Sequence, residues 1–232
     1  MSIIKIEEIE ELMYQSFKKA IIDFSKTENN KDVYAVVFDC DLSDFSVCIR
    51  YANENDYEKR LINYDKYAYM YKPYGKKGLL GYKYNSVGDF NRIEWEADSA
   101  IKHFFNSCRC QSTDAVYYEN ADRPADTFEY KGAILRGDVQ TELLHCCNGE
   151  FQKDGEFFIG FASELSDVFE ELIINCIQRL KDDYLGLDKT DNFIVFMSDH
   201  DISNATFSEY VSRTVDKNIF DQLTDYSNFE QE

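Results

Sequence analysis

The chain has 232 residues, of which 44 are acidic and 25 basic, so its formal net charge at pH 7 is -19. Hydrophobic residues make up 44% and aromatic residues 16%, which is enough for a buried core and excludes a disordered protein. So negative a chain repels phosphate backbones and anionic lipids, which disfavours direct nucleic-acid or membrane binding and favours a basic protein partner. The alternative interpretation is that the charge only keeps the protein soluble.

The start of the chain favours a cytoplasmic protein. Four glutamates, at positions 7, 8, 10 and 11, stand where a signal peptide would carry basic residues and an apolar core. No apolar run approaches the length of a membrane span. The seven cysteines form an odd set without the spacing of a disulfide framework, which fits a reducing compartment.

The first half of the chain predicts helices around a hairpin. Apolar residues three or four apart predict an amphipathic helix over residues 4–24, with Ile6, Ile9, Met13, Phe17, Ala20 and Phe24 on its buried face. The β-rich runs 33–40 and 45–51 predict two hairpin strands, the first of them buried on both faces. Helical spacing returns over 54–71 and 95–108.

The second half predicts more helices and one late strand. Ser163 is a candidate N-cap for a long helix that ends near Gly186. The other expected elements are a short helix over 139–147, a brief strand over 157–162, a strand over 192–199, and helices over 204–214 and 217–225. Because no regular βαβ order is present, the fold class predicted is α+β, a single domain of residues 1–232 with a central, mostly antiparallel sheet flanked by helices.

Two predicted strands end in carboxylates. Asp39 and Asp41 follow the first strand, and Asp199, His200 and Asp201 follow the last. Parallel neighbouring strands would gather these side chains at one sheet edge, where Mg²⁺ or Mn²⁺ would find oxygen ligands, and a metal-assisted hydrolase is then the alternative function. Antiparallel strands would separate them. The simpler interpretation is that these residues only end strands and cap the helix at 204.

No other motif indicates a reaction. The cysteine and histidine runs at 108–110 and 145–147 lack the spacing of a zinc site and are better explained as buried thiols. The basic, glycine-rich stretch 72–90 lacks the Gly-Lys-Ser/Thr of a phosphate-binding loop. The sequence therefore predicts no catalytic residue, no metal ligand and no cofactor.

Three short stretches carry a family resemblance. They are the amphipathic first helix leading to "VYAVVFDC", the "EW" of Glu94 and Trp95, and "NFIVFMSDHD" followed by "YVSRTVDKNIFDQL". Together they resemble a bacterial family of domains of unknown function, the one numbered 4303, over about residues 5–223. The chain departs from the family pattern over 106–160. Some members of that family are similar in context to immunity proteins that neutralise secreted toxins.

The resemblance implies a cytoplasmic immunity-type protein that neutralises a basic toxin domain, such as a nuclease. Acidic loop residues would steer the partner and tyrosines would anchor it, since tyrosine gives rigid amphipathic contact area. The partner contacts predicted on this basis are Asp39, Asp41, Asp44, Tyr69, Tyr71, Tyr74, Asp199 and Asp201. The simpler interpretation of any single tyrosine is a core residue with a satisfied hydroxyl group.

Overall fold

A computed structural model describes residues 3–42, 45–62, 64, 81–84, 86–109, 127–131, 133–136, 145–147, 150–153, 156–159, 161–199 and 204–216. The chain divides into two compact units. Unit 1 comprises Met1–Ser16, Asp41–Ser46 and Glu96–Cys176, and unit 2 comprises Phe17–Cys40, Val47–Trp95 and Ile177–Glu232. Helices flank a mixed sheet, so the α+β class predicted from the sequence is confirmed.

The main sheet belongs to unit 2. Its strands, in spatial order, are β10 (Lys189–Asp199), β2 (Val33–Asp41), β3 (Ser46–Asn53) and β4 (Asn91–Arg92). β10 pairs with β2 in parallel, whereas β3 and β4 are antiparallel. The short link between β2 and β3 permits only an antiparallel hairpin, since a parallel connection needs a dozen residues or more.

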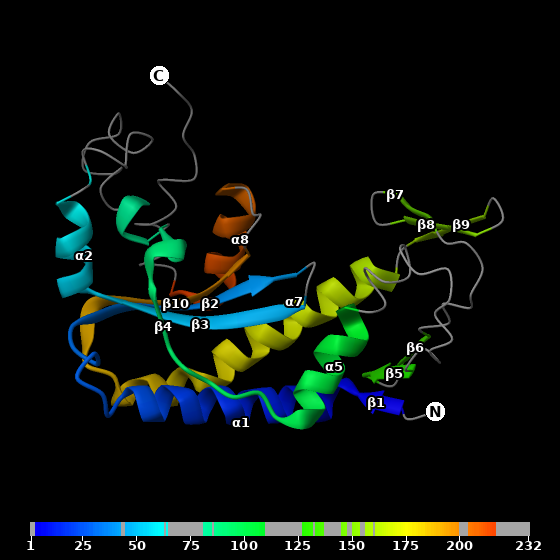
Figure 1. Ribbon diagram of the computed structural model, residues 1–232, viewed down its shortest axis with the longest axis horizontal. Helices are drawn as coiled ribbons and strands as arrows, with labels where there is room; N and C mark the ends of the chain where they lie inside the picture. Colours follow the sequence, from blue (N-terminus) through cyan, green and yellow to red (C-terminus); the bar gives the residue numbers. More distant parts are fainter. Residues whose placement is uncertain are drawn as a thin grey trace, which may run out of the picture. The chain divides into compact units, whose positions relative to one another are not determined.

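Strand β2 is buried along eight of its nine residues, as its unbroken apolar run predicts. The C-terminal half of α1 (Ile6–Phe24) packs on one face of the sheet (Figure 1). There the Phe17 and Phe38 rings meet edge to face with centroids 5.1 Å apart. All the predicted residues of the buried face of α1 are buried, namely Ile6, Ile9, Met13, Phe17, Ala20 and Phe24, and Ile21 is buried as well.

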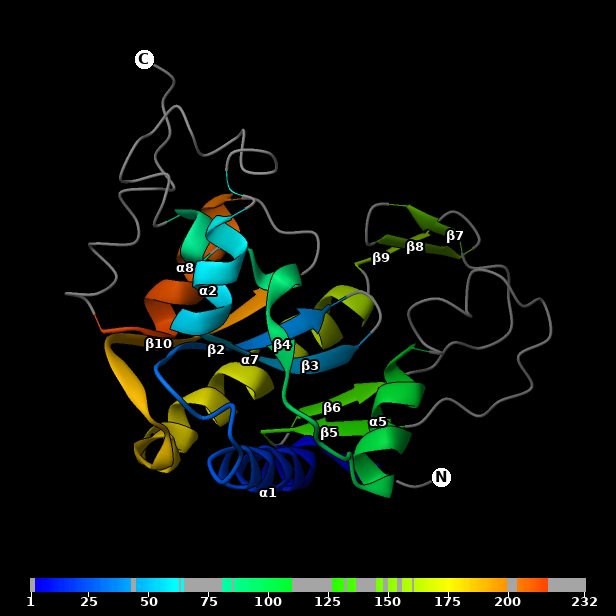
Figure 2. The same cartoon turned by 60° about the vertical axis from the view of Figure 1, so that its left-hand side comes forward.

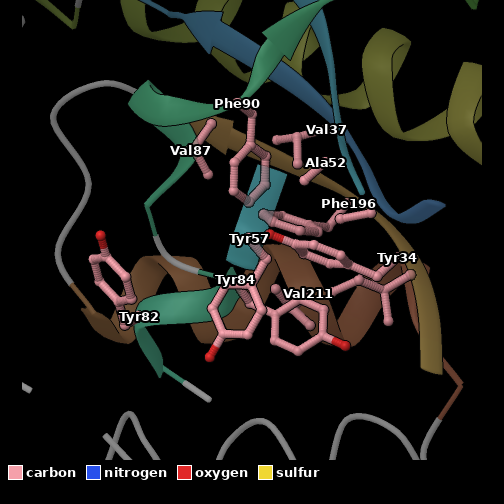
Figure 3. Packing of buried hydrophobic residues seen from close by; sticks show 12 residues of the cluster. Tyr34, Val37, Ala52, Tyr57, Tyr82, Tyr84, Val87, Phe90, Phe196 and Val211 are labelled. Carbon is pink, nitrogen blue, oxygen red and sulfur yellow. The ribbon is translucent and has the colours of Figure 1, made fainter. Parts of the chain in front are cut away.

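The other face of the sheet carries α2 (Glu54–Leu61) and α8 (Asn204–Thr214), both drawn above it in Figure 1. Helix α2 begins where the Asn53 side chain accepts a hydrogen bond from the Asp56 backbone N–H at 2.9 Å. The apolar layer beneath these helices contains side chains from β2, β10, α2, α8 and residues 82–90 (Figure 3). The remainder of the predicted helix 54–71 and the predicted helix 217–225 lie outside the described residues, apart from positions 62 and 64.

The long helix α7 (Phe161–Arg179) continues into a 3-10 helix, η4 (Leu180–Gly186). This segment confirms the predicted helix near 163–184, but α7 begins at Phe161. Ser163 is therefore inside the helix and the predicted N-cap is wrong.

Unit 1 holds two small sheets. β1 (Ile3–Lys5) pairs in parallel with β5 (Thr127–Tyr130), and β5 lies beside β6 (Ala133–Arg136), as Figure 2 shows. The second sheet joins β7 (His145–Cys147), β8 (Glu150–Lys153) and β9 (Glu156–Ile159). The strand predicted over 157–162 is confirmed for 157–159 in β9 and is wrong for 161 and 162, which belong to α7. The helix predicted over 139–147 is wrong for 145–147, where cross-strand pairing with β8 gives a strand.

Helix α5 (Ser99–Arg109) begins after Asp98, whose carboxylate accepts a hydrogen bond from the Ala100 N–H at 2.8 Å. The predicted start at Trp95 is thus four residues too early. Ile101, Phe104 and Cys108 face inward, as their spacing predicts. Within the described part of the chain, no helix is both long and apolar enough to span a membrane.

Candidate functional site

The carboxyl ends of β2 and β10 form the edge at which the sequence predicted a cluster of carboxylates. The two strands are parallel neighbours, so the condition for that cluster is met. Ser198 lies opposite Asp39, and Asp199 lies opposite Cys40. The edge of a sheet beyond the carboxyl ends of parallel strands is where α/β proteins commonly bind ligands.

The register divides these carboxylates between the two faces of the sheet. Successive residues of a strand point to opposite faces, so Asp39 and Asp41 share one face while Cys40 faces the other. Because Asp199 is in register with Cys40, it belongs to the face opposite Asp39. Asp41 and Asp199 are both half-buried. The strand ends therefore bring these residues to one edge without directing them at one point.

Asp39 forms a buried ion pair. Its side chain is 4% exposed, and its carboxylate accepts a hydrogen bond from Arg50 Nε at 2.5 Å. Arg50 Nη1 also donates to the Phe90 backbone carbonyl at 3.1 Å, so the guanidinium links β2 and β3 to the segment before β4. The contact with a protein partner predicted for Asp39 does not fit this burial. Arg50 was not predicted as a site residue.

The described residues do not supply a set of ligands for a divalent metal ion. No group of three or more His, Cys, Asp or Glu residues is placed to hold a metal ion in this part of the chain. His200 and Asp201 lie outside it. The metal-assisted hydrolase alternative therefore stays a prediction that depends on those two residues.

The predicted anchors Tyr69, Tyr71 and Tyr74, together with the predicted contact Asp44, also lie outside the described residues. The tyrosines that the structure describes are buried or half-buried, with Tyr34 fully enclosed. For these tyrosines the core interpretation is the better one.

The cysteines that the structure describes with their side chains are free thiols. Cys40, Cys108 and Cys176 are buried and Cys48 is half-buried. Burial raises the pKa of the Cys48 thiol, with Arg50 acting in the opposite direction. A raised pKa lowers the thiolate fraction, so Cys48 is a poor nucleophile.

The described residues contain a second polar cluster, centred on Tyr34 in unit 2. The Tyr34 hydroxyl donates to the Lys83 backbone carbonyl at 3.0 Å and accepts a hydrogen bond from Arg60 Nη2. Lys83 Nζ forms an ion pair with Glu54 at 2.5 Å. We call Tyr34, Glu54, Arg60 and Lys83 the Tyr34 cluster.

Aromatic rings surround both cations of this cluster. The Arg60 guanidinium carbon lies 5.6 Å from the centroids of Tyr57 and Tyr82 and 5.1 Å from that of Phe90. Lys83 Nζ lies 4.5 Å from the Tyr34 centroid and 5.0 Å from the Tyr57 centroid. These distances are within the range of cation–π attraction. Apart from the abundance of tyrosine, no feature of the sequence predicts these ring contacts with Arg60 and Lys83.

The burial of Tyr34 and Tyr57 makes the stability of the folded protein depend on pH in the alkaline range. Burial raises the pKa of Tyr57 from 10.0 to about 12 and also raises the pKa of Tyr34, while Arg60 opposes both shifts. Below pH 10 both phenols are neutral in the folded and unfolded states. Above it the unfolded chain ionises first, so we expect stability to fall between about pH 10 and about pH 12.

Urea unfolding measured from about pH 8 to about pH 12, with tyrosinate absorbance followed in parallel, tests this expectation. The Tyr57→Phe variant should lose less stability over the same interval. Ionisation of Tyr34 and Tyr57 near pH 10 in the folded protein would contradict it.

The negative charge of the chain is unevenly divided between the two units. Unit 1 contains 22 acidic and 7 basic residues, a net charge of -15. Unit 2 contains 22 acidic and 18 basic residues, a net charge of -4. Glu7, Glu8 and Glu11 on α1 and Asp167 on α7 are among the exposed carboxylates of unit 1. The excess negative charge is thus concentrated in one unit.

Comparison with known protein families, with curated proteins and with solved structures found no match to this chain.

Proposed function

We propose that this protein is a cytoplasmic immunity-type protein that binds a basic toxin domain and neutralises it. The observation that carries the proposal is the charge of unit 1, with 22 acidic residues against 7 basic ones. A surface of one sign raises the local concentration of an oppositely charged partner and accelerates its association. The resemblance to family 4303 agrees with this proposal.

The basic residues described in unit 1 are few and balance little of its negative charge. Lys5 lies 3.8 Å from Glu8, and Lys102 lies 4.0 Å from Glu96. The backbone N–H of Lys131 donates to the Glu7 carboxylate. A basic partner would therefore meet a surface on which carboxylates outnumber cations, and steering by such a surface weakens as salt screens it.

An immunity protein inhibits its toxin by binding it tightly and does not need to catalyse a reaction. Steering by charge sets the association rate, whereas buried anchor residues set the dissociation rate. In this proposal the anchors are Tyr69, Tyr71 and Tyr74, since the described tyrosines are buried or half-buried. Asp41 and Asp199, which are half-buried at the sheet edge, remain candidate contacts.

Charge reversal in unit 1 tests the proposal. The variant Glu8→Lys, Glu11→Lys, Asp167→Lys changes three exposed side chains. If a gene next to its own encodes the toxin, as this proposal expects, the association rate of the variant with that basic toxin domain should fall about 10- to 100-fold at about 0.05 M salt, because steering is lost. Biolayer interferometry at about 0.05 M and about 0.5 M salt measures both this loss and its screening.

A matched variant in unit 2 separates location from net charge. Glu28→Lys, Asp191→Lys, Glu209→Lys makes the same change of charge at three exposed positions. It should slow association by less than about threefold. Equal losses in the two variants would show that only net charge matters, and the absence of binding by the unmodified protein would refute the immunity proposal.

A further inference from the structure

Arg60 in the Tyr34 cluster has an incomplete set of hydrogen-bond partners. A guanidinium group carries five N–H donors in one plane. Its central carbon lies over the rings of Tyr57, Tyr82 and Phe90, and one edge is used when Nη2 donates to the Tyr34 hydroxyl. Nη1 is buried and has no hydrogen-bond partner among the residues that the structure describes.

Such a donor is unusual in a folded protein. More than nine in ten buried polar groups have a partner, because a buried donor without one has lost its hydrogen bonds to water and gained nothing in return. No described acceptor completes Arg60: the Tyr34 oxygen is taken by Nη2, and the Glu54 carboxylate binds Lys83. The geometry therefore lacks one acceptor on the Nη1 edge.

The charge of the cluster points to the same missing group. Arg60 and Lys83 contribute two positive charges and Glu54 one negative charge, which leaves one positive charge among aromatic side chains. Partly buried charges are usually paired.

We propose that unit 2 binds a small oxyanion, a phosphate or carboxylate group, through the Nη1 edge of Arg60 and the ammonium group of Lys83. A guanidinium edge matches the spacing of two oxygens on either group, and a hydrogen bond between charged partners is about twice as strong as a neutral one. The bound anion would satisfy the free donor and neutralise the excess charge. Support for this site does not rest on the toxin-binding role proposed above.

Entry of the anion requires a small movement of neighbouring groups. Nη1 is shielded from solvent in this structure, so an oxygen atom reaches it only when a neighbouring group moves aside. Tyr57 and Tyr82 are the tyrosines whose rings lie over Arg60. Binding should therefore also change the near-ultraviolet circular dichroism of the protein, to which ordered tyrosines contribute.

Titration of the full-length protein with inorganic phosphate tests the proposal. At saturation we expect the midpoint of thermal unfolding to rise by about 3 °C or more above a sodium chloride control of equal ionic strength. Isothermal titration calorimetry on the same protein should show saturable binding. Sodium acetate forms a second arm: a response to phosphate alone identifies a phosphoryl ligand, and a response to both identifies a site that also accepts carboxylates.

Arg60→Lys is the matched variant because it keeps the positive charge but removes the planar fork. It should lose most of the phosphate-dependent rise in the unfolding midpoint. Lys83→Gln, which keeps Arg60 and its ring contacts, should weaken phosphate binding and provides a second test if Arg60→Lys does not fold. The site is ruled out if phosphate acts on the unmodified protein no more than chloride does, or if both variants respond as the unmodified protein does.

Discussion

Replacing Arg50 with Met should lower the free energy of unfolding by about 3–5 kcal/mol, because it leaves the Asp39 carboxylate buried without the Arg50 guanidinium. Asp39 is 4% exposed and Arg50 is 11% exposed, so little water is available to replace the lost contact. The substitution also removes the donor to the Phe90 carbonyl. Urea unfolding at neutral pH measures the change.

The double variant Asp39→Asn, Arg50→Met is the control for this result. Once the charge on Asp39 is removed, the apolar side chain at position 50 no longer leaves a charge without a partner. The double variant should therefore be more stable than Arg50→Met alone. Additive losses would mean that the two side chains do not interact, contrary to the 2.5 Å contact.

The second large effect is expected from Phe17→Ala on α1. Phe17 is fully buried, and its ring lies 5.1 Å from that of Phe38 and 4.9 Å from that of Trp95. Truncation leaves a cavity at the contact between α1 and the main sheet, so we expect a loss of about 3–5 kcal/mol. Thermal and urea unfolding, each followed by circular dichroism, give the value.

Ile22→Ala on the same helix is the matched control for Phe17→Ala. Ile22 is 37% exposed, so its truncation should cost less than about 1 kcal/mol. If the two variants were equally stable, the burial of Phe17 against Phe38 would not contribute as the structure indicates.

The main helices and strands could be predicted from the sequence because burial imposes a period on it. The apolar positions of α1 recur every three or four residues, and β2 is an apolar run too short for a helix and rich in β-branched residues. β10 follows from the same kind of run. By contrast, β7 is held by pairing with β8, so the sequence of β7 alone did not reveal it.

The candidate site was less predictable because it depends on register and on partners distant in sequence. Nothing local shows that Asp199 lies opposite Cys40 and not opposite Asp39. One feature of the sequence does indicate part of this site. Arg50 is a lone charge in the strand run "FSVCIRY", and a charge in such a position calls for a buried partner.

The Tyr34 cluster was unpredictable for the same reason, because its members are far apart in the sequence. Tyr34 on β2 contacts Arg60 on α2 and Lys83, which lie 26 and 49 residues further along the chain. A count of tyrosines predicts neither these contacts nor the ring stacking on Arg60. Only the three-dimensional arrangement distinguishes tyrosines that are buried and hydrogen-bonded in the core from those that are exposed and can contact another protein.

The parallel pairing of β2 with β10 also affects how the protein is made. β2 ends at Asp41 and its neighbour begins at Lys189, so a ribosome must add about 150 residues before the strand has a partner on that side. At about 5–20 residues per second this takes about 8–30 s. For that time the nascent chain exposes a strongly apolar, unpaired strand edge, and we expect chaperones to bind it there.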